Sequence, residues 1–284
     1  MSLSRGDLLL IWALRVLAAV AGAIVVLITV FLVLEAAPAL RSVGPARFFA
    51  DSSWHPTEHL YNLTPMLWGT FFAAGGAVVV ATPLGVLSAI FCQYYAPPLV
   101  ARQYRRLVAL LAGIPSVVYG LWGLVVLVPL IGRVQPPGSS LLAGIAILTI
   151  MILPTIALTA DASFANVPQQ YLQGAAALGL PRWATVRGVV LPAARSGLFT
   201  AVILGTGRAI GETMAVLMVC GNIVQTPESP FSPVRTLTAN IALEMAYATG
   251  DHRSALFVSG LLLTIMVVAL VAAAEVVSKG RIYG

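Results

Sequence analysis

Long apolar stretches dominate this sequence and limit what the chain can fold into. A helix that crosses a bilayer needs about 20 mostly apolar residues, and six stretches qualify, near 10–34, 67–91, 107–131, 141–160, 197–223 and 254–275. Only 9% of the 284 residues are charged and the mean hydropathy is +0.95, whereas ordinary soluble domains contain about 25% charged residues. We therefore predict an all-α integral membrane protein with six transmembrane helices, forming a single domain over residues 1–284.

Charged residues between the stretches indicate the orientation of the chain. The first apolar run, residues 8–34, is about twice as long as the apolar region of a signal peptide, so we expect it to be retained as a span. With both termini inside, the inner segments carry nine Lys or Arg residues and the outer segments carry five, which favours N-in and C-in. The inner set is Arg5, Arg102, Arg105, Arg106, Arg182, Arg187, Arg195, Lys279 and Arg281, and the outer set is Arg41, Arg47, Arg133, Arg235 and Arg253.

Composition and motifs also argue against two other classes of protein. The arginines are scattered singly or in threes, without the basic stripe and interleaved aromatics of a nucleic-acid surface, so we expect membrane lipid and no nucleic acid as a partner. The chain has no GxxxxGK[ST] loop, and its single lysine, Lys279, follows "EVVS". Because the P-loop lysine that reaches the β/γ-phosphates is missing, we expect no ATP hydrolysis by this chain and no cofactor bound to it.

The segment "GRAIGETMAV" places two charges, Arg208 and Glu212, inside the apolar stretch 197–223. On a continuous helix these residues share a face. A charge near the middle of a bilayer costs roughly 2.5–3.5 kcal/mol on insertion scales, and such residues are functional candidates by default. One interpretation is a structural ion pair. The other is an anion site on a transport path, in which the guanidinium exchanges the Glu212 carboxylate for the passing substrate.

The inner segment 161–196 has a different character from the other connections. Its run "QGAAALGLPRWATVRGVVLP" holds helix formers around a Gly-Leu-Pro break. This pattern predicts two short helices at the membrane surface, joined by a turn at Gly179 to Pro181.

The same run resembles the EAA loop of ATP-binding-cassette importer permeases. That pattern is Glu-Ala-Ala, three residues, Gly, nine residues and then Ile-x-Leu-Pro. The positions that match or replace it are Gln173, Gly174, Ala175, Gly179, Val189, Leu191 and Pro192. The resemblance implies a type I importer permease fold, in which this loop lies between spans 4 and 5 and docks on an ATPase subunit. Gln173 replaces the acidic residue, which removes one ionic contact to that subunit.

Further segments resemble one branch of this family, the PstC-type permeases of phosphate-specific importers. They are "GRAIGETMAV" followed by "CGN", then "GIPSVVYGLWG" at 113–123, and "WHP" ahead of "LWGT". The resemblance covers most of the chain, from about Leu34 onward. It implies a bacterial cytoplasmic membrane location, a sister permease PstA, a PstB ATPase dimer that uses ATP and Mg, and an external phosphate-binding protein PstS. It also implies that Arg208 and Glu212 lie on the phosphate path.

Other functions remain open at this point. The chain could carry another oxyanion, or it could be an ATP-independent anion transporter, although such a transporter needs no coupling loop. The run "HPTEH", His55 to His59, fits the zinc-binding pattern H-x-x-E-H, but no third ligand is evident. Bound zinc would identify a membrane hydrolase; we expect no metal.

Overall fold

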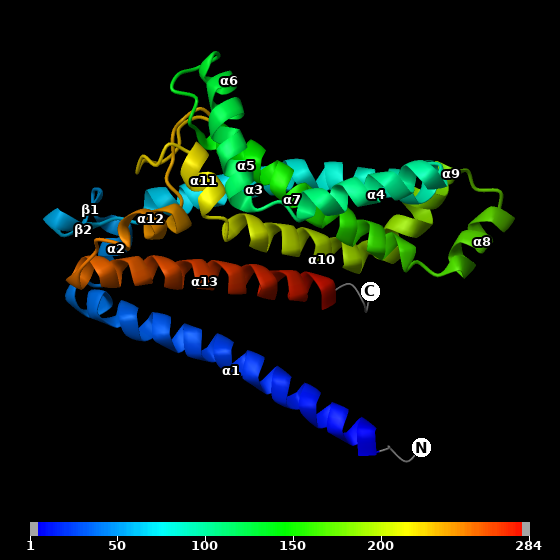
Figure 1. Ribbon diagram of the computed structural model, residues 1–284, viewed down its shortest axis with the longest axis horizontal. Coiled ribbons are helices and arrows are strands. Elements are labelled where there is room, and N and C mark those ends of the chain that lie inside the picture. The colour runs from blue at the N-terminus through cyan, green and yellow to red at the C-terminus, as the bar shows by residue number, and fades with distance from the viewer. Residues whose placement is uncertain (1–4, 280–284) are drawn as a thin grey trace.

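The computed structural model describes residues 5–279, and helices make up most of it (Figure 1). A small antiparallel hairpin pairs Trp54 with Tyr61 and His55 with Leu60. The α-helices and strands are α1 Arg5–Ser42, α2 Arg47–Ala50, β1 Trp54–His55, β2 Leu60–Tyr61, α3 Thr64–Ile90, α4 Pro98–Ala112, α5 Ser116–Trp122, α6 Val128–Gly132, α7 Leu141–Ala165, α8 Gln169–Ala177, α9 Arg182–Thr185, α10 Leu191–Ile210, α11 Met214–Val219, α12 Leu237–Glu244 and α13 Gly250–Lys279. A 3-10 turn occupies Pro56–Glu58, and π-helical turns occupy Phe91–Tyr95, Gly123–Leu127 and Val186–Val190.

Among the described residues, five helices are long and apolar enough to cross a bilayer, and a bent pair of helices would make a sixth. Each overlaps one of the apolar stretches, which confirms the all-α membrane class. Their boundaries differ from the predicted ones. For example, α1 continues past residue 34 to Ser42, because its last turns pack on other helices through the buried Ala36 and Ala39.

Two of the predicted spans are not continuous helices. In the stretch 107–131, α4 and the helix Ser116–Gly132 meet at an angle of 91°. Pro115 stands directly before α5, where it has no N–H to continue the hydrogen bonding of α4 and its fixed φ suits the start of a new helix. In the stretch 197–223, α10 ends at Ile210 and α11 begins at Met214. The structure therefore divides two of the predicted spans into shorter helices at these two places.

Small side chains let α3 and α7 pack closely at the centre of the bundle. Along α3 the residues Ala73, Ala77 and Ala81 are buried. A Cβ atom at Gly85 would lie 2.8 Å from the Ile156 side chain of α7, so only glycine fits at this approach. Lipid gives little hydrophobic drive between helices, and close contact of small residues is a main source of their association.

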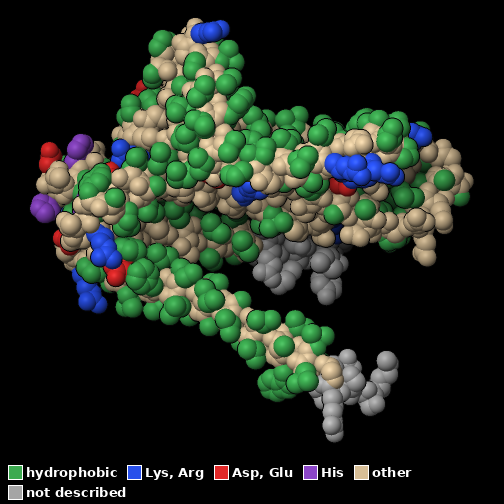
Figure 2. Space-filling view, in the orientation of Figure 1, with side chains coloured by type: hydrophobic (Ala, Val, Ile, Leu, Met, Phe, Trp, Pro, Cys, Tyr) green, Lys and Arg blue, Asp and Glu red, His purple; other side chains and the backbone are tan. Residues whose placement is uncertain are grey.

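The bundle has two different ends (Figure 1). The hairpin, α2 and α12 lie at one end, which we call the outer end, and α8 and α9 lie at the other, the inner end. α1 begins and α13 ends toward the inner end, and α1 diverges from the rest so that its most apolar part has no buried residue. Apolar side chains cover the flanks, and charged ones gather mainly toward the ends (Figure 2). Arg281, counted above among the inner charges, lies outside the described residues.

Candidate functional site

Arg208 lies in the last turn of α10, half-buried, near the middle of the bundle. Its Nη1 donates a hydrogen bond to Oγ1 of Thr155 at 3.1 Å, and Thr155 is close to the midpoint of α7. Within the part of the chain that is described, this is the one hydrogen bond of the guanidinium, and no carboxylate oxygen lies within 4.0 Å of it. A guanidinium has five N–H donors. The remaining donors are therefore free to bind an oxyanion in a planar fork.

Glu212 lies in the break between α10 and α11, so the spacing of four residues does not place it on the helix face of Arg208. Its Oε1 accepts the main-chain N–H of Ala215 at 3.0 Å, which satisfies one free donor at the start of α11. Its main-chain oxygen accepts a hydrogen bond from Oγ1 of Thr238 at 2.8 Å. The expected ion pair between Arg208 and Glu212 is not formed among the described residues, because α10 stops at Ile210.

The break between α4 and α5 lies next to this region. On α5, the Tyr119 hydroxyl donates to the main-chain oxygen of Leu111 at 2.8 Å and so bridges the break. α5 packs on α11 so closely that a Cβ atom at Gly120 would lie 2.9 Å from Cα of Ala215. Tyr119 belongs to the same buried core cluster as Ala209 and Ile210, the two residues that follow Arg208. Two broken helices thus meet near Arg208, which has no carboxylate partner among the described residues. Irregular backbone at this depth is tolerated where it is buried in protein or lines a binding path.

The predicted turn in the inner loop is confirmed. Gly179 follows α8 with φ +67, its N–H donates to the oxygen of Ala176 at 3.0 Å, and the N–H of Leu180 donates to the oxygen of Ala175 at 3.1 Å. This pair of bonds is a Schellman motif, which ends a helix with a residue in the left-handed conformation. Glycine adopts that conformation without a steric penalty.

Around this turn, large apolar side chains are exposed at the inner end. Leu178 is 80% exposed, Trp183 55% and Tyr171 53%. Gln173 and Gly174 are exposed on α8, whereas Ala175 is buried. Exposed apolar side chains of this kind are available for contact with another protein or with lipid.

The second half of the EAA-like run belongs to the long helix that follows α8, and does not form a separate surface helix. α9, the π turn at Val186–Val190 and α10 form one apolar helix over Arg182–Ile210. Pro192 lies in the first turn of α10. We attribute the continuity to the π turn, which accommodates the missing N–H of this proline without ending the helix. Val189 and Leu191 are half-buried there, and Pro192 is exposed.

The "HPTEH" run lies in the outer hairpin and not on a helix. His55 ends β1, a 3-10 turn follows, and His59 adopts the left-handed conformation with φ 58. The zinc pattern requires two histidines one turn apart on a helix. Over residues 5–279 no group of three or more His, Cys, Asp or Glu side chains is placed to hold a metal ion. The zinc-hydrolase alternative therefore lacks its geometry.

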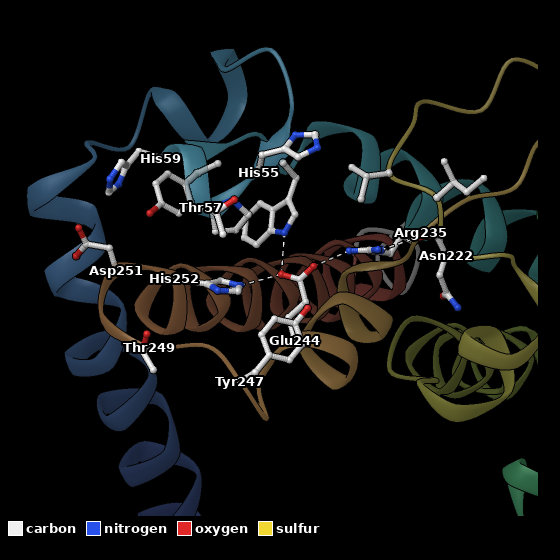
Figure 3. Close-up of a pocket in the computed structure, with 15 residues that line it drawn as sticks. His55, Thr57, His59, Asn222, Arg235, Glu244, Tyr247, Thr249, Asp251 and His252 are labelled. Carbon is white, nitrogen blue, oxygen red and sulfur yellow. Dashed lines mark hydrogen bonds and ion pairs between the residues drawn. The ribbon is translucent and has the colours of Figure 1, made fainter.

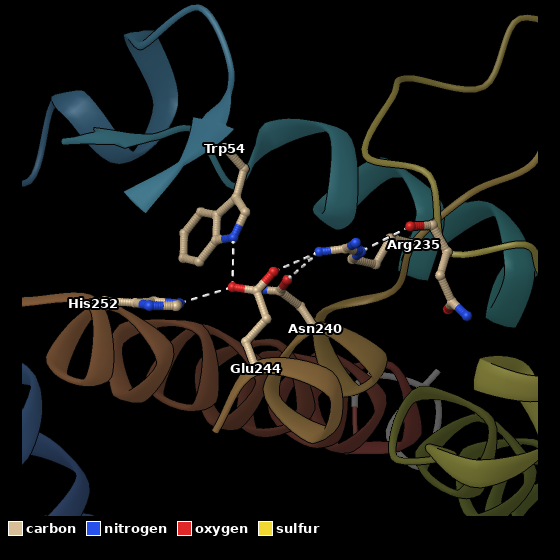
Figure 4. A network of polar contacts seen from close by, with 6 residues as sticks. Trp54, Arg235, Asn240, Glu244 and His252 are labelled. Carbon is tan, nitrogen blue, oxygen red and sulfur yellow. Dashed lines mark hydrogen bonds and ion pairs between the residues drawn. The ribbon is translucent and has the colours of Figure 1, made fainter. Parts of the chain in front are cut away.

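A buried carboxylate joins three outer segments whose contact the sequence analysis did not predict (Figure 4). Glu244, at the end of α12, accepts hydrogen bonds from Nε1 of Trp54 at 2.9 Å and Nη1 of Arg235 at 2.7 Å, and Nε2 of His252 lies 2.8 Å from it. Its side chain is 9% exposed. Arg235 also donates to Oδ1 of Asn240 at 3.1 Å. Because a buried charge is tolerated only when paired and hydrogen-bonded, this network fixes the hairpin, the loop before α12 and the start of α13 together.

A cavity of about 860 Å³ opens beside this network at the outer end (Figure 3). We call it the outer cavity. All three histidines of the sequence line it, His55 and His59 from the hairpin and His252 from α13. Tyr247, 66% exposed, stands among the lining residues. Sequence reasoning missed this cavity because its walls come from three segments that are far apart in the chain.

A second network that the sequence did not reveal lies at the inner end. Arg105 of α4 binds both carboxylate oxygens of Asp161 on α7, through Nε at 2.7 Å and Nη2 at 2.9 Å, and also reaches Oε1 of Gln93 at 2.7 Å. The positive-inside count used Arg105 only as a topological charge. Its bidentate pairing also ties α4 to the inner part of α7.

These features define a multi-pass helical membrane protein, with an arginine beside a helix break and an exposed helical loop at one end. The chain belongs to the family of binding-protein-dependent transport system inner membrane components, which it matches over residues 81–280. A probable ABC transporter permease of Bacillus subtilis, YqgH, is 41% identical over 249 residues, covering 85% of this chain and 81% of that protein. The phosphate transport system permease protein PstC of Haemophilus influenzae is 38% identical over 241 residues, covering 77% and 76%.

Solved structures share the fold at low sequence identity. The methionine ABC transporter MetNI in an inward-facing conformation matches with a TM-score of 0.58 and 21% identity, covering 77% of this chain and 93% of the solved one. An amino acid ABC transporter solved with histidines matches with a TM-score of 0.56 and 16% identity, covering 76% and 92%. The predicted type I importer permease fold is thereby confirmed.

Proposed function

We propose that this chain is the membrane-spanning permease subunit of an ATP-driven importer of inorganic phosphate. The observation that carries the proposal is the Arg208 guanidinium, which lies at the end of α10 beside a helix break and has the neutral Thr155 as its one hydrogen-bond partner among the described residues. Relatives named as phosphate transport permeases support phosphate as the substrate.

The chemistry of the two charged residues suits a protonated oxyanion. Arg208 offers free N–H donors to anionic oxygens. Glu212 uses Oε1 to accept the Ala215 N–H, and its other carboxylate oxygen has no hydrogen bond to any residue that the structure describes. That oxygen can accept a hydrogen bond from the protonated oxygen of phosphate. Phosphate keeps a proton near neutral pH and sulfate does not, so this acceptor would favour phosphate.

The exposed inner loop supports coupling to a separate ATPase. In the proposed assembly a PstB dimer, which uses ATP and Mg, docks on α8 and the Gly179 turn, a sister permease PstA completes the path, and PstS delivers phosphate from outside. α1 begins and α13 ends on the side of α8, which supports N-in and C-in in a bacterial cytoplasmic membrane. Closure of the ATPase dimer would move the inner loop and the long helix that follows it, Arg182–Ile210, and so open the path outward. Hydrolysis would then return the permease to its inward-open state.

The test is ATP-dependent uptake of radiolabelled phosphate by vesicles that hold this chain with PstA, PstB and PstS. Arg208→Gln removes the charge and the fork. Two charge-assisted hydrogen bonds at about 1.5–3 kcal/mol each predict a loss of roughly 10²- to 10⁴-fold in uptake efficiency. Arg133→Gln is the matched control, because Arg133 is exposed and has no side-chain bond to the described residues.

The outcomes separate the alternatives. If both variants assemble with the other subunits and only Arg208→Gln loses phosphate uptake, the result supports Arg208 as a substrate site. Equal uptake in both variants would show that phosphate does not pass Arg208. Native vesicles that take up sulfate in preference to phosphate would support the alternative of another oxyanion, and uptake without ATP would support an ATP-independent transporter.

A further inference from the structure

We propose that the outer cavity is the docking site for a cationic loop of the external binding protein, and that α12 connects this docking to the helix break at Glu212. The inference rests on the proposed function, which supplies the binding protein as partner. It assigns a place and a charge to a contact that neither the sequence nor the relatives locate.

The outer cavity has the surface expected of a protein contact. Its exposed lining includes Tyr247, 66% exposed, and Ile223, 50% exposed, with His55 and His59 on the hairpin side. Aromatic residues are enriched at protein interfaces, and exposed apolar side chains become buried there. The hairpin and the start of α13, which line it, lie at the end of the bundle opposite α8 (Figure 1), the end that a soluble external protein would reach.

One unpaired carboxylate gives the outer cavity its charge. Arg235 and Glu244 neutralise each other at 2.7 Å. Asp251, in the first turn of α13, also lines the cavity, and no ion pair joins it to another residue in the described part of the chain. With neutral histidines the lining therefore carries one net negative charge, and a lysine or arginine on the partner loop would complement it.

α12 runs from the outer cavity to the substrate region. This eight-residue helix carries Glu244 in the cavity wall at one end. At its other end the Leu237 N–H donates to Oγ1 of Thr70 on α3 at 3.0 Å, and Oγ1 of Thr238 donates to the main-chain oxygen of Glu212 at 2.8 Å. A helix of this length spans about 12 Å. One rigid element thus contacts both the docking surface and the break that follows Arg208.

A small movement at the cavity can therefore reach the substrate site. A partner loop that displaces the Glu244 end would also shift Thr238 and strain or release its hydrogen bond to Glu212. The break has no continuous helical hydrogen bonding to resist that shift. The two sites are coupled only if partner docking at the outer cavity and substrate binding at Arg208 both shift the same conformational equilibrium. Two measurements test this.

The first experiment tests docking. It measures the concentration of phosphate-loaded PstS that gives half-maximal stimulation of ATPase activity in the reconstituted importer. Asp251→Asn should raise that concentration about fivefold at low salt, the upper range for an exposed charge pair, and less at high salt. Glu228→Gln, an exposed outer carboxylate outside the cavity, is the control and should leave it unchanged. Identical half-saturation in the two variants would overturn the docking site.

The second experiment tests the connection through α12. It uses Thr238→Val, which removes the hydroxyl but keeps the shape of the side chain. The half-saturating concentration of PstS should stay at the native value, which would show that the outer end is folded. Maximal stimulation of the ATPase and phosphate uptake should both fall, and Thr238→Ser should restore both. Thr264→Val is the control, because its hydroxyl bonds within α13 to the Gly260 oxygen. Native maximal stimulation in Thr238→Val would overturn the link. An importer that PstS stimulates but that takes up no phosphate would contradict the proposed substrate and leave the docking result standing.

Discussion

Replacing Gly179 tests whether the shape of the inner turn matters for coupling. Gly179 has φ +67 and closes the Schellman motif after α8. A Cβ atom there would meet nothing within 4 Å, so a side chain causes no clash inside this chain. The expected cost is conformational, about 1–2 kcal/mol for an ordinary residue in the left-handed region and less for asparagine, which adopts it more readily. Gly179→Val and Gly179→Asn therefore differ mainly in backbone strain.

The assay is the affinity of the purified ATPase subunit for this permease pair, together with the ratio of phosphate taken up to ATP hydrolysed. A penalty of 1–2 kcal/mol corresponds to roughly 5- to 30-fold weaker docking for the valine variant. The asparagine variant should lie much closer to native. Equal loss in both variants would show that the ATPase excludes any side chain at this position. Native coupling in both would refute a docking role for the turn.

Two further predictions concern the outer end. Glu244→Gln leaves Arg235 without its buried counter-charge, so the purified protein should lose about 3 kcal/mol of stability; an unchanged melting temperature would contradict this. Burial works to raise the pKa of Asp51, but hydrogen bonds from Arg47 and the Tyr61 N–H, with the Arg47 charge, lower it below 3.8 overall. Its contribution to stability is therefore complete above that pH and is lost as pH falls through the lower folded-state pKa. Protease protection of the hairpin should show this acid dependence in the native chain and not in Asp51→Asn.

Much of the fold could be predicted because its causes are local. Apolar length identifies the membrane helices, since each must satisfy its own backbone in lipid. The turn at Gly179 could also be predicted, because a glycine and a proline two residues apart end one helix and allow the next to begin. These features depend on neighbours in the sequence.

The breaks and networks could not be predicted because their causes are not local. Around Arg208 the sequence is compatible with a continuous helix, and the spacing to Glu212 even favours one. Contacts of α11 with α5 and of Thr238 with Glu212 involve residues distant in sequence. The 91° angle between α4 and the helix Ser116–Gly132 depends on the packing of both halves.

The Glu244 network also sets an order for biosynthesis. Trp54 and Glu244 are 190 positions apart, so the hairpin enters the membrane surface long before its partner carboxylate is made. At about 5–20 residues per second this interval is on the order of 10–40 s. During that time the Trp54 indole has no buried acceptor at this position, and α1 and α3 must stay inserted without it. The outer end therefore cannot be completed until α12 and the start of α13 have been made, so a chain that stalls before Glu244 would leave the Trp54 hairpin without its buried partner.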